Sequence, residues 1–234
     1  MKRSTVNDIL AESDAFIRSH GLVLPPFAYW TPDEMKRHTA NGSAMIRDHM
    51  LGWDITDYGQ GDFENLGLFL FTVRNGSAAN VQAGMGMLYA EKLLISDVDQ
   101  ISPMHHHILK TEDIINRGGG TLVLELFKRA EDGSIDDTAG VRVRCDGTWR
   151  TLPAGGLLKL APGESVTLEP DIWHAFWGEG GKVLIGEVSN VNDDRTDNIF
   201  RESIGRFSDI EEDEAPRHLL VSDYDTWLTR DGAR

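Results

Sequence analysis

The segment 103–112 carries three consecutive histidines followed by an acidic residue. Side chains alternate between the two faces of a strand, so His105 and His107 share one face while His106 points to the other. Two imidazoles on one face can bind a single metal ion. Glu112 lies five residues beyond His107, which is the wrong parity for an uninterrupted strand, so a turn or bulge must redirect its side chain. A solvent-exposed histidine cluster is the alternative interpretation.

Another histidine, His174, lies in a strand-like, aromatic-rich segment that ends at a run of glycines. We expect Glu179-Gly180 to form the turn of a two-residue hairpin, which places His174 opposite Ile185. Glu187 then falls on the same sheet face as His174, one diagonal step away. This register brings a carboxylate beside the metal. The alternative for His174 is a core histidine that is hydrogen-bonded to the backbone.

These two segments resemble the two sequence motifs of the cupin superfamily. The first motif spans 105–119, with two histidines one residue apart, then four residues, Glu112, six residues and Gly119. The second spans 163–174; it has one residue fewer between its proline and its histidine than is usual, and Ile172 where glycine is common. The resemblance implies an all-β cupin jelly-roll barrel and these metal ligands: His105, His107, Glu112 and His174.

The chain also resembles the D-lyxose isomerase family over nearly its whole length. The segments that carry the resemblance are Met1–Ser4, Val6–Ile9, Leu24–Ala28, Leu51–Asp57, Tyr89–Lys92, Glu112–Gly120, His174–Trp177, Gly186–Ser189, Asn192–Asp194 and Ile210–Glu214. This resemblance implies a manganese-type metal, reversible conversion of D-lyxose to D-xylulose with some activity on D-mannose, and a homodimer. For the divalent metal, Mn²⁺ is the first expectation, and Co²⁺, Zn²⁺ and Fe²⁺ are the alternatives.

Residues near the expected ligands supply the other groups that an isomerase needs. Three imidazoles and one carboxylate leave one or two positions of an octahedral ion open for the carbonyl and hydroxyl oxygens of an aldose. Conversion to the ketose moves a proton from C2 to C1, which needs a general base, and we predict Glu187 for it. Lys110 is expected to stabilise the developing oxyanion or to shuttle a proton to it. A surface lysine is the alternative for Lys110.

Two charged residues follow the 192–194 segment and are candidates for binding the sugar. We expect Asp197 and Arg206 to bind substrate hydroxyls. Ordinary surface charges are the alternative for both residues.

Two other functions are compatible with the expected ligand set. Three histidines and one glutamate also suit iron in a cupin dioxygenase, but oxygen activation favours an apolar cavity. Glu187, Lys110 and the polar run 192–198 favour a sugar. The other alternative is a non-catalytic sugar-binding cupin; such proteins often lose ligands, whereas all four are present here.

The segments around these residues predict strands, preceded by two helices. Ser4 or Thr5 is expected to cap a first helix that ends at Gly21. Thr31, Pro32 and Glu34 predict a capping box and a first-turn proline for a second helix. Both helices are expected to pack outside the barrel.

Short β-like runs follow at close spacing, which favours a jelly roll over a parallel sheet. The runs are Leu68–Val73, Met87–Ile95, Ile101–Ile108, Thr121–Lys128, Val141–Cys145, Thr148–Leu152, Leu157–Leu160, Ser165–Leu168, Ile172–Trp177 and Lys182–Ser189. We therefore expect one domain over 1–234, with a helical N-terminal extension over 1–60, the barrel over 61–200 and a C-terminal extension over 201–234.

Composition narrows the partners. Of the 234 residues, 38 are acidic and 23 basic, and the net charge of -15 excludes a basic surface for nucleic acid or an anionic membrane. The acidic stretch Glu211–Glu214 is expected to be a solvated tail. A single cysteine, Cys145, allows no internal disulfide, and we find no signal peptide and no run of the ~18 to 20 apolar residues that a membrane span needs. A cytoplasmic enzyme with a neutral monosaccharide substrate is expected.

Overall fold

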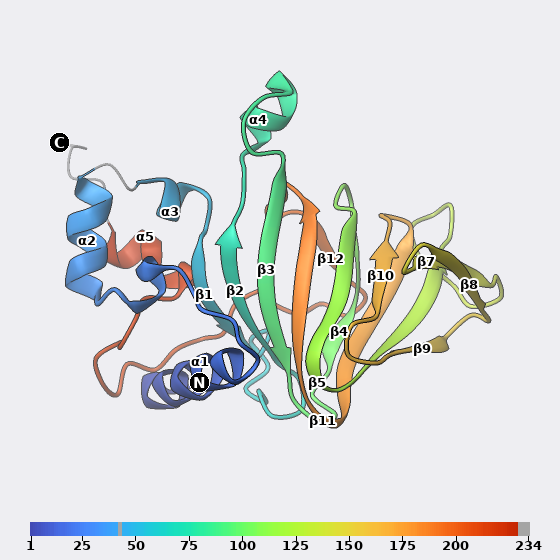
Figure 1. Cartoon of the computed structure of the whole chain (residues 1–234), viewed down its shortest axis with the longest axis horizontal. Helices are drawn as coiled ribbons and strands as arrows, with labels where there is room; N and C mark the ends of the chain where they lie inside the picture. Colours follow the sequence, from blue (N-terminus) through green and yellow to red (C-terminus); the bar gives the residue numbers. More distant parts are fainter. Residues whose placement is uncertain (42–43, 229–234) are drawn as a thin grey trace.

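The computed structural model describes residues 1–41 and 44–228, which form a large antiparallel β structure with helices at one side (Figure 1). The helices are α1 (Arg3–Ser19), η1 (Pro26–Tyr29), α2 (Pro32–Ala40), α3 (Ala44–Asp48), α4 (Ala78–Ala83), η2 (Val221–Asp223) and α5 (Tyr224–Trp227). The strands are β1 (Gly52–Thr56), β2 (Leu68–Arg74), β3 (Tyr89–Ser96), β4 (Ser102–His107), β5 (Glu112–Arg129), β6 (Ile135–Asp136), β7 (Val141–Cys145), β8 (Thr148–Leu152), β9 (Gly156–Leu160), β10 (Ser165–Leu168), β11 (Ile172–Asn190) and β12 (Asn198–Phe200).

Two long strands, β5 and β11, hold the barrel together because each serves two sheets. One part of each lies in the order β1-β2-β3-β11-β5-β10-β7-β8. Farther along, β11 pairs with β4, and β5 pairs with β9. The main apolar core draws side chains from β2, β3, β5, β7, β9, β10 and β11 and therefore lies between the two sheets. This arrangement confirms the predicted all-β jelly-roll class.

The expected hairpin at Glu179-Gly180 is wrong. The segment is one strand, β11, which stays paired with β5 on both sides of a bulge at residues 180–182. Phe176 faces the main core before the bulge, and Val183 and Ile185 face it afterwards. Across the bulge the inner face therefore passes from even-numbered to odd-numbered positions of β11. Glu187 reaches the inner face by this route.

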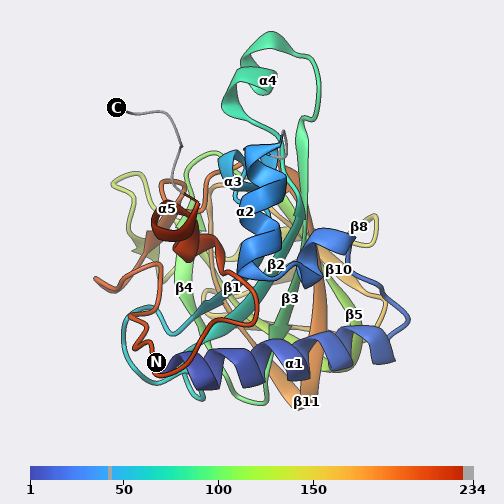
Figure 2. The same ribbon diagram turned by 90° about the vertical axis from the view of Figure 1, so that its left-hand side faces the viewer.

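Helix α1 covers the outer face of the β1-β2-β3 region, as Figure 2 shows from the side. Its apolar residues Val6, Leu10 and Ile17 are buried in a second core. The strand residues packed in that core include Trp53, Ile55, Phe69, Phe71, Leu93, Ile95 and Leu184. The predicted position of the helices outside the barrel is confirmed, and α1 leaves the barrel interior free for polar residues.

The two predicted helix caps have different outcomes. In α2, Thr31 and Glu34 form the capping box, with Glu34 Oε2 accepting from the Thr31 N–H at 2.9 Å. The cap predicted for α1 is wrong, because the helix already begins at Arg3. The Ser4 hydroxyl instead donates to Asp213 at 2.7 Å, and the same carboxylate accepts the Ser4 N–H. The acidic stretch around Asp213 is exposed, as expected, but it also holds the N-terminus of α1.

The strand β1 lies inside the stretch 1–60 that was expected to be a helical extension. It pairs with β2 in the main sheet, so the sheet begins at Gly52. All five residues of β1 are buried, which removes the alternating pattern that reveals a half-buried strand. The end of the expected C-terminal extension, 229–234, lies outside the described residues. In the described ranges no helix combines the length and apolarity that crossing a membrane requires.

Arg3 forms a buried ion-pair network that ties α1 to the C-terminal segment. Its guanidinium donates to Asp223 at 2.8 and 3.0 Å and to Glu212 at 2.6 and 2.9 Å, and its side chain is 0% exposed. We expect Arg3→Met to lower the free energy of unfolding by about 3 to 5 kcal/mol, because it leaves a buried carboxylate without its partner. Urea denaturation measures the change.

The matched control is Arg18→Met, which breaks the partly exposed pair between Arg18 and Asp14. A loss below about 1 kcal/mol is expected there, since exposed pairs contribute little. Equal losses of unfolding free energy for the two variants would show that the burial of Arg3 does not increase the contribution of its ion pairs to stability.

Candidate active site

Three histidines from two neighbouring strands meet inside the barrel. His105 and His107 lie on β4, and His174 on β11 stands directly opposite His105. The three side chains are buried, and each offers one nitrogen within 4.8 Å of the other two. His106 faces the other way and packs edge-on against Trp173, with 4.5 Å between ring centroids. The alternation predicted for this strand is therefore confirmed, and the expectation of an exposed cluster is excluded.

Backbone carbonyls orient two of these rings. The Nδ1 atom of His105 donates to the carbonyl of Pro103 at 2.8 Å, and that of His174 donates to the carbonyl of Ile172 at 3.2 Å. A ring that donates through Nδ1 keeps the lone pair of Nε2 free. A metal-binding histidine usually makes such a hydrogen bond through its other ring nitrogen, because the bond fixes both the tautomer and the orientation of the ring.

Glu112 is the first residue of β5, and the turn between β4 and β5 redirects its side chain as the parity required. Its Oε1 lies 3.1 Å from His107 Nε2 and 3.4 Å from His174 Nε2. The carboxylate and the imidazole nitrogens thus approach one point.

The residues at this point fit a divalent metal. His174 Nε2 is buried and has no hydrogen-bond partner among the described residues. Burial, followed by the nearby imidazoles, lowers the pKa of His105 well below its ordinary value, so this ring is neutral and able to bind a cation. Three imidazoles and one carboxylate form a donor set suited to Mn²⁺, Fe²⁺, Co²⁺ or Zn²⁺.

Lys110 and Glu187 lie beside the cluster. Lys110 Nζ is 2.6 Å from Glu112 Oε2 and 3.2 Å from Glu187 Oε1. Burial opposes the charge of Lys110, but Glu112 and Glu187 outweigh it and raise the lysine pKa, so the group stays protonated. Lys110 is 3% exposed, which excludes the surface alternative. Its contact with a developing oxyanion stays a prediction.

Lys92 is a neighbour of Glu187 that the sequence did not reveal. It stands opposite Glu187 in the pairing of β3 with β11, and its Nζ lies 3.2 Å from Glu187 Oε1. The same Nζ is 2.8 Å from Asp194 Oδ1. Burial would raise the pKa of Asp194, but Lys92, Lys110 and Arg206 hold it well below its usual range. The only signal for Lys92 was a charged residue at the centre of an apolar strand.

Lys92 and Asp194 form a charged wall beside the metal ligands, and Arg206 extends this wall through its ion pair with Asp54. Arg206 Nη2 lies 2.7 Å from Asp54 Oδ2 and 3.6 Å from Asp194 Oδ2. Burial raises the pKa of Asp54 despite the guanidinium beside it. Arg206 Nη1 is buried without a hydrogen-bond partner among the described residues.

Asp197 is buried and holds the turn that follows β4. Its two carboxylate oxygens accept the backbone N–H groups of Leu109 and Lys110 at 2.8 and 3.1 Å. Its Oδ2 also lies 4.0 Å from His107 Nδ1. Asp197 therefore positions Lys110, and the expectation that it binds the sugar stays a prediction.

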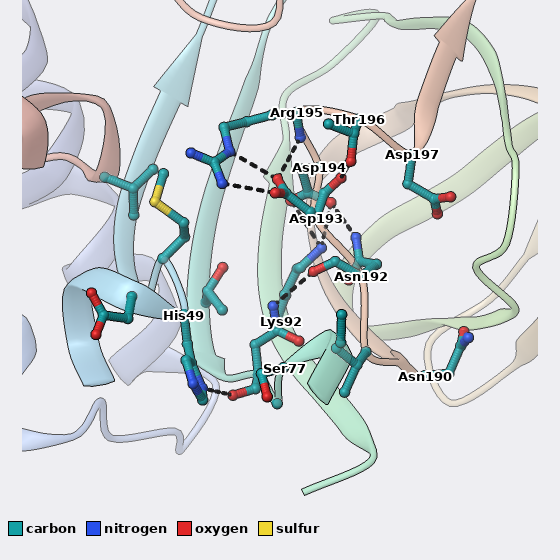
Figure 3. A pocket seen from close by; sticks show the side chains of 18 of the residues that line it. His49, Ser77, Lys92, Asn190, Asn192, Asp193, Asp194, Arg195, Thr196 and Asp197 are labelled. Atoms are coloured by element: carbon teal, nitrogen blue, oxygen red, sulfur yellow. Dashed lines mark hydrogen bonds and ion pairs between the residues drawn. The ribbon is translucent and has the colours of Figure 1, made fainter. Parts of the chain in front are cut away.

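Two adjoining cavities surround these residues. The inner cavity has a volume of about 40 Å³, and its walls include His105, His107, Glu112 and Glu187. The outer cavity has about 640 Å³ and is bounded by α4, β2, β3 and the 190–197 segment (Figure 3). The two cavities share four residues of their walls: Leu70, Lys92, Asp194 and Arg206.

The neutral imidazoles predict how stability depends on pH. Burial lowers the pKa of His105 and, with the charge of Lys110, that of His107 below the ordinary 6.5. Below pH 6.5 the unfolded chain binds protons that the folded chain does not bind. The free energy of unfolding therefore decreases as the pH is lowered. For metal-free protein we expect up to about 1.4 kcal/mol per pH unit from each histidine between pH 6.5 and the lowered pKa.

Urea unfolding of metal-free protein at pH 7 and pH 5.5 measures this slope. His105→Gln is the matched control. It should remove about half of the pH dependence of the free energy of unfolding that His105 and His107 contribute together. An unchanged slope in the variant would contradict the neutral state assigned to His105.

Comparison with known proteins identifies the family. A model of the D-lyxose isomerase family matches residues 1–224. The chain belongs to the D-lyxose isomerase family. The D-lyxose/D-mannose isomerase of Serratia proteamaculans is 46% identical over 226 residues, 96% of this chain and 98% of that protein. The D-lyxose/D-mannose isomerase of Escherichia coli O157:H7 is 42% identical over 228 residues, with the same coverage. As a D-lyxose isomerase family member, the protein is a sugar isomerase.

Solved structures share the fold of this D-lyxose isomerase family member. The L-ribose isomerase of Acinetobacter sp. DL28 in complex with L-ribose has a TM-score of 0.60 at 15% identity. The L-ribose isomerase of Cellulomonas parahominis with L-psicose has a TM-score of 0.59 at 16% identity. Each match covers 90% of this chain and 98% of the other chain. At such identities the likeness concerns the fold.

Proposed function

We propose that this protein interconverts D-lyxose and D-xylulose, and also D-mannose and D-fructose, as a metal-dependent isomerase of free sugars. The observation that carries the proposal is the convergence of three buried imidazoles and the Glu112 carboxylate beside Glu187 and Lys110. Relatives named D-lyxose/D-mannose isomerase, at 42% and 46% identity, support the choice of sugars.

His105, His107, Glu112 and His174 would hold the divalent metal, with Mn²⁺ as the proposed ion. When bound, such an ion supplies Lewis-acid polarisation of the carbonyl and hydroxyl oxygens at C1 and C2 of the sugar. The sequence and the geometry favour no single metal of the first transition row, and the choice of Mn²⁺ rests on the family.

Glu187 is the proposed general base, which takes the proton from C2 and returns it to C1. Lys92 and Lys110 each place Nζ 3.2 Å from its Oε1, so one carboxylate oxygen is held by two cations. This arrangement fixes the orientation of the carboxylate through Oε1, and Oε2 would take the proton. Lys110, which stays charged, would stabilise negative charge that develops on the substrate oxygen.

The polar walls favour a sugar over the dioxygenase alternative. The inner cavity is bounded by the charged side chains of Lys92, Lys110, Glu187 and Asp194, whereas oxygen activation favours apolar surroundings. The complete set of four ligands beside a base also speaks against a non-catalytic binding protein.

The cations of this site are already engaged, which favours a neutral substrate. Lys92 pairs with Asp194 at 2.8 Å, and Arg206 pairs with Asp54 at 2.7 Å. A phosphate would need at least one such cation to leave its carboxylate. We therefore propose free monosaccharides as substrates.

The test is ketose formation from a panel of free aldoses by metal-stripped protein, with each divalent ion added back under anaerobic conditions. Turnover of D-lyxose restored by Mn²⁺ without oxygen is the expected result. Activity that needs oxygen would support the dioxygenase, and sugar binding without turnover would support the non-catalytic protein.

We also propose that the chain is a single domain over 1–234, forms a homodimer and works in the cytoplasm. Light scattering of the purified protein tests the dimer, and a mass of one chain would exclude it. Fractionation of cells that produce the native protein tests the location.

A further inference from the structure

The outer cavity is much larger than a monosaccharide needs. The inner cavity of about 40 Å³ has room for about three water molecules at ~10–15 Å³ each, so it encloses only the reacting end of a sugar. The outer cavity of about 640 Å³ lies within the range of about 300–1,000 Å³ that encloses drug-sized ligands. The two cavities adjoin at Lys92, Asp194 and Arg206, which belong to both walls.

Unpaired polar atoms line the outer cavity. The Oδ1 atoms of Asp54, Asn75 and Asn192 are buried and have no hydrogen-bond partner within the described part of the chain. Asp54 is 1% exposed and Asn75 9% exposed. Arg206 Nη1 adds one unpaired donor to these acceptors. Buried polar groups in native proteins are nearly always paired, so these residues of the cavity wall lack partners that the described chain does not supply.

The charge of the wall further defines this ligand. Its three cations are all paired: Lys92 with Asp194, Arg206 with Asp54, and Arg195 with Asp193 at 2.7 Å. The remaining wall combines neutral hydrogen-bonding side chains with apolar ones; the former include Thr72, Ser77, Gln82, Asn190 and Thr196, and the latter Met50, Leu70, Val81, Leu109 and Val191. Figure 3 shows how Lys92, Asn192 and Asp194 meet at this wall. Within the described ranges the wall thus offers no unpaired basic side chain to an anionic group, and its neutral polar side chains are suited to hydroxyl groups.

We propose that the outer cavity binds a second sugar unit, so that the protein isomerises reducing disaccharides as well as monosaccharides. The inference rests on the proposed function, because the reducing-end aldose must reach the histidine cluster. In the reaction the C2–H bond breaks, a C1–H bond forms, and the hydroxyl proton on O2 passes to O1 as C2 becomes the carbonyl. The glycosidic bond stays intact, and no co-reactant is needed.

The test uses β-1,4-linked mannobiose, whose reducing unit is D-mannose, with D-mannose and D-lyxose as parallel substrates of the metal-loaded protein. We expect a keto-disaccharide without release of free mannose, and kcat/KM within about tenfold of that for D-mannose. Conversion of both monosaccharides but not of mannobiose would overturn this inference and leave the proposed function intact. Failure of all three sugars would overturn both.

A pair of tryptophan variants tests the location. Val81, on α4, lines the outer cavity and is 51% exposed, so Val81→Trp fills the cavity without disturbing a core. We expect the ratio of kcat/KM for mannobiose to that for D-mannose to fall at least tenfold. Met85→Trp is the matched control, because Met85 follows the same helix, is 69% exposed and is not part of the cavity wall. Equal ratios in both variants would exclude the outer cavity.

Calorimetry gives a readout that does not depend on turnover. Metal-loaded Glu187→Gln should bind mannobiose, and adding Val81→Trp should weaken this binding at least tenfold. Unchanged affinity in the double variant would also contradict the assignment.

Discussion

Glu187→Gln is expected to lower kcat for D-lyxose by about 1,000-fold while the metal content stays at that of the wild type. A carboxamide is nearly isosteric and still accepts hydrogen bonds from Lys92 and Lys110, but it cannot take up the C2 proton, and a general base typically contributes 10²- to 10⁴-fold. The ion-pair contacts of Glu187 are to Lys92 and Lys110 and not to the three histidines. The variant should therefore leave the histidines in place. Ketose formation and metal analysis of the same sample measure the two quantities.

The matched control for this variant is Glu91→Gln. Glu91 lies on β3 next to Lys92 but points outward, where it pairs with Arg74 at 2.8 Å. We expect less than a twofold change in kcat. If Glu187→Gln kept its metal and turned over D-lyxose at the wild-type rate, Glu187 would not be the base.

His107→Ala should remove both metal and activity. It deletes one of three imidazoles and leaves Glu112 without the partner at 3.1 Å. Changes to residues that only support metal ligands typically weaken binding 10- to 100-fold, so loss of a ligand itself should weaken binding by more than about 100-fold. Competition with a chelator of known affinity measures the change.

His106→Gln is the control beside it. His106 follows the same strand but packs against Trp173 on the opposite face, so metal affinity should change less than threefold. Full metal content in His107→Ala would defeat the assignment of His107 as a ligand.

Local patterns in the sequence predicted the elements whose signals are local. Asp146-Gly147, between β7 and β8, is a dipeptide typical of two-residue hairpin turns, and both residues have positive φ, 49° and 77°, as the turn requires. The strands on either side, β7 and β8, begin and end where expected. The alternation of His105 and His107 likewise needs only strand geometry, and it was correct.

Features that depend on pairing between distant strands could not be predicted from local patterns. The segment Gly178-Glu179-Gly180-Gly181 has the composition of a turn, yet the chain continues as β11 because β5 pairs with it on both sides of the bulge. The first half of β5 was not predicted either, because the polar and glycine residues in 112–120 give no apolar alternation. The predicted position of Glu187 beside the histidine cluster was correct, although the hairpin from which it was derived does not form.

The charged wall beyond the metal ligands was the least predictable part. Lys92 and Asp194 meet only because β3 pairs with β11 and the 190–197 segment returns over them. The carboxylate of Asp197 accepts hydrogen bonds from the turn after β4, which the sequence did not predict, and its binding of a sugar stays a prediction. Motif spacing identifies residues near one another in sequence, whereas these contacts depend on the complete fold.

Diffraction from crystals grown with MnCl₂, recorded at the manganese absorption edge, tests the central claim most directly. The account predicts one strong anomalous peak inside the barrel, at roughly 2.0–2.3 Å from a nitrogen of His105, His107 and His174 and from a carboxylate oxygen of Glu112. A peak elsewhere, or no peak at this cluster in protein that converts D-lyxose, would contradict it.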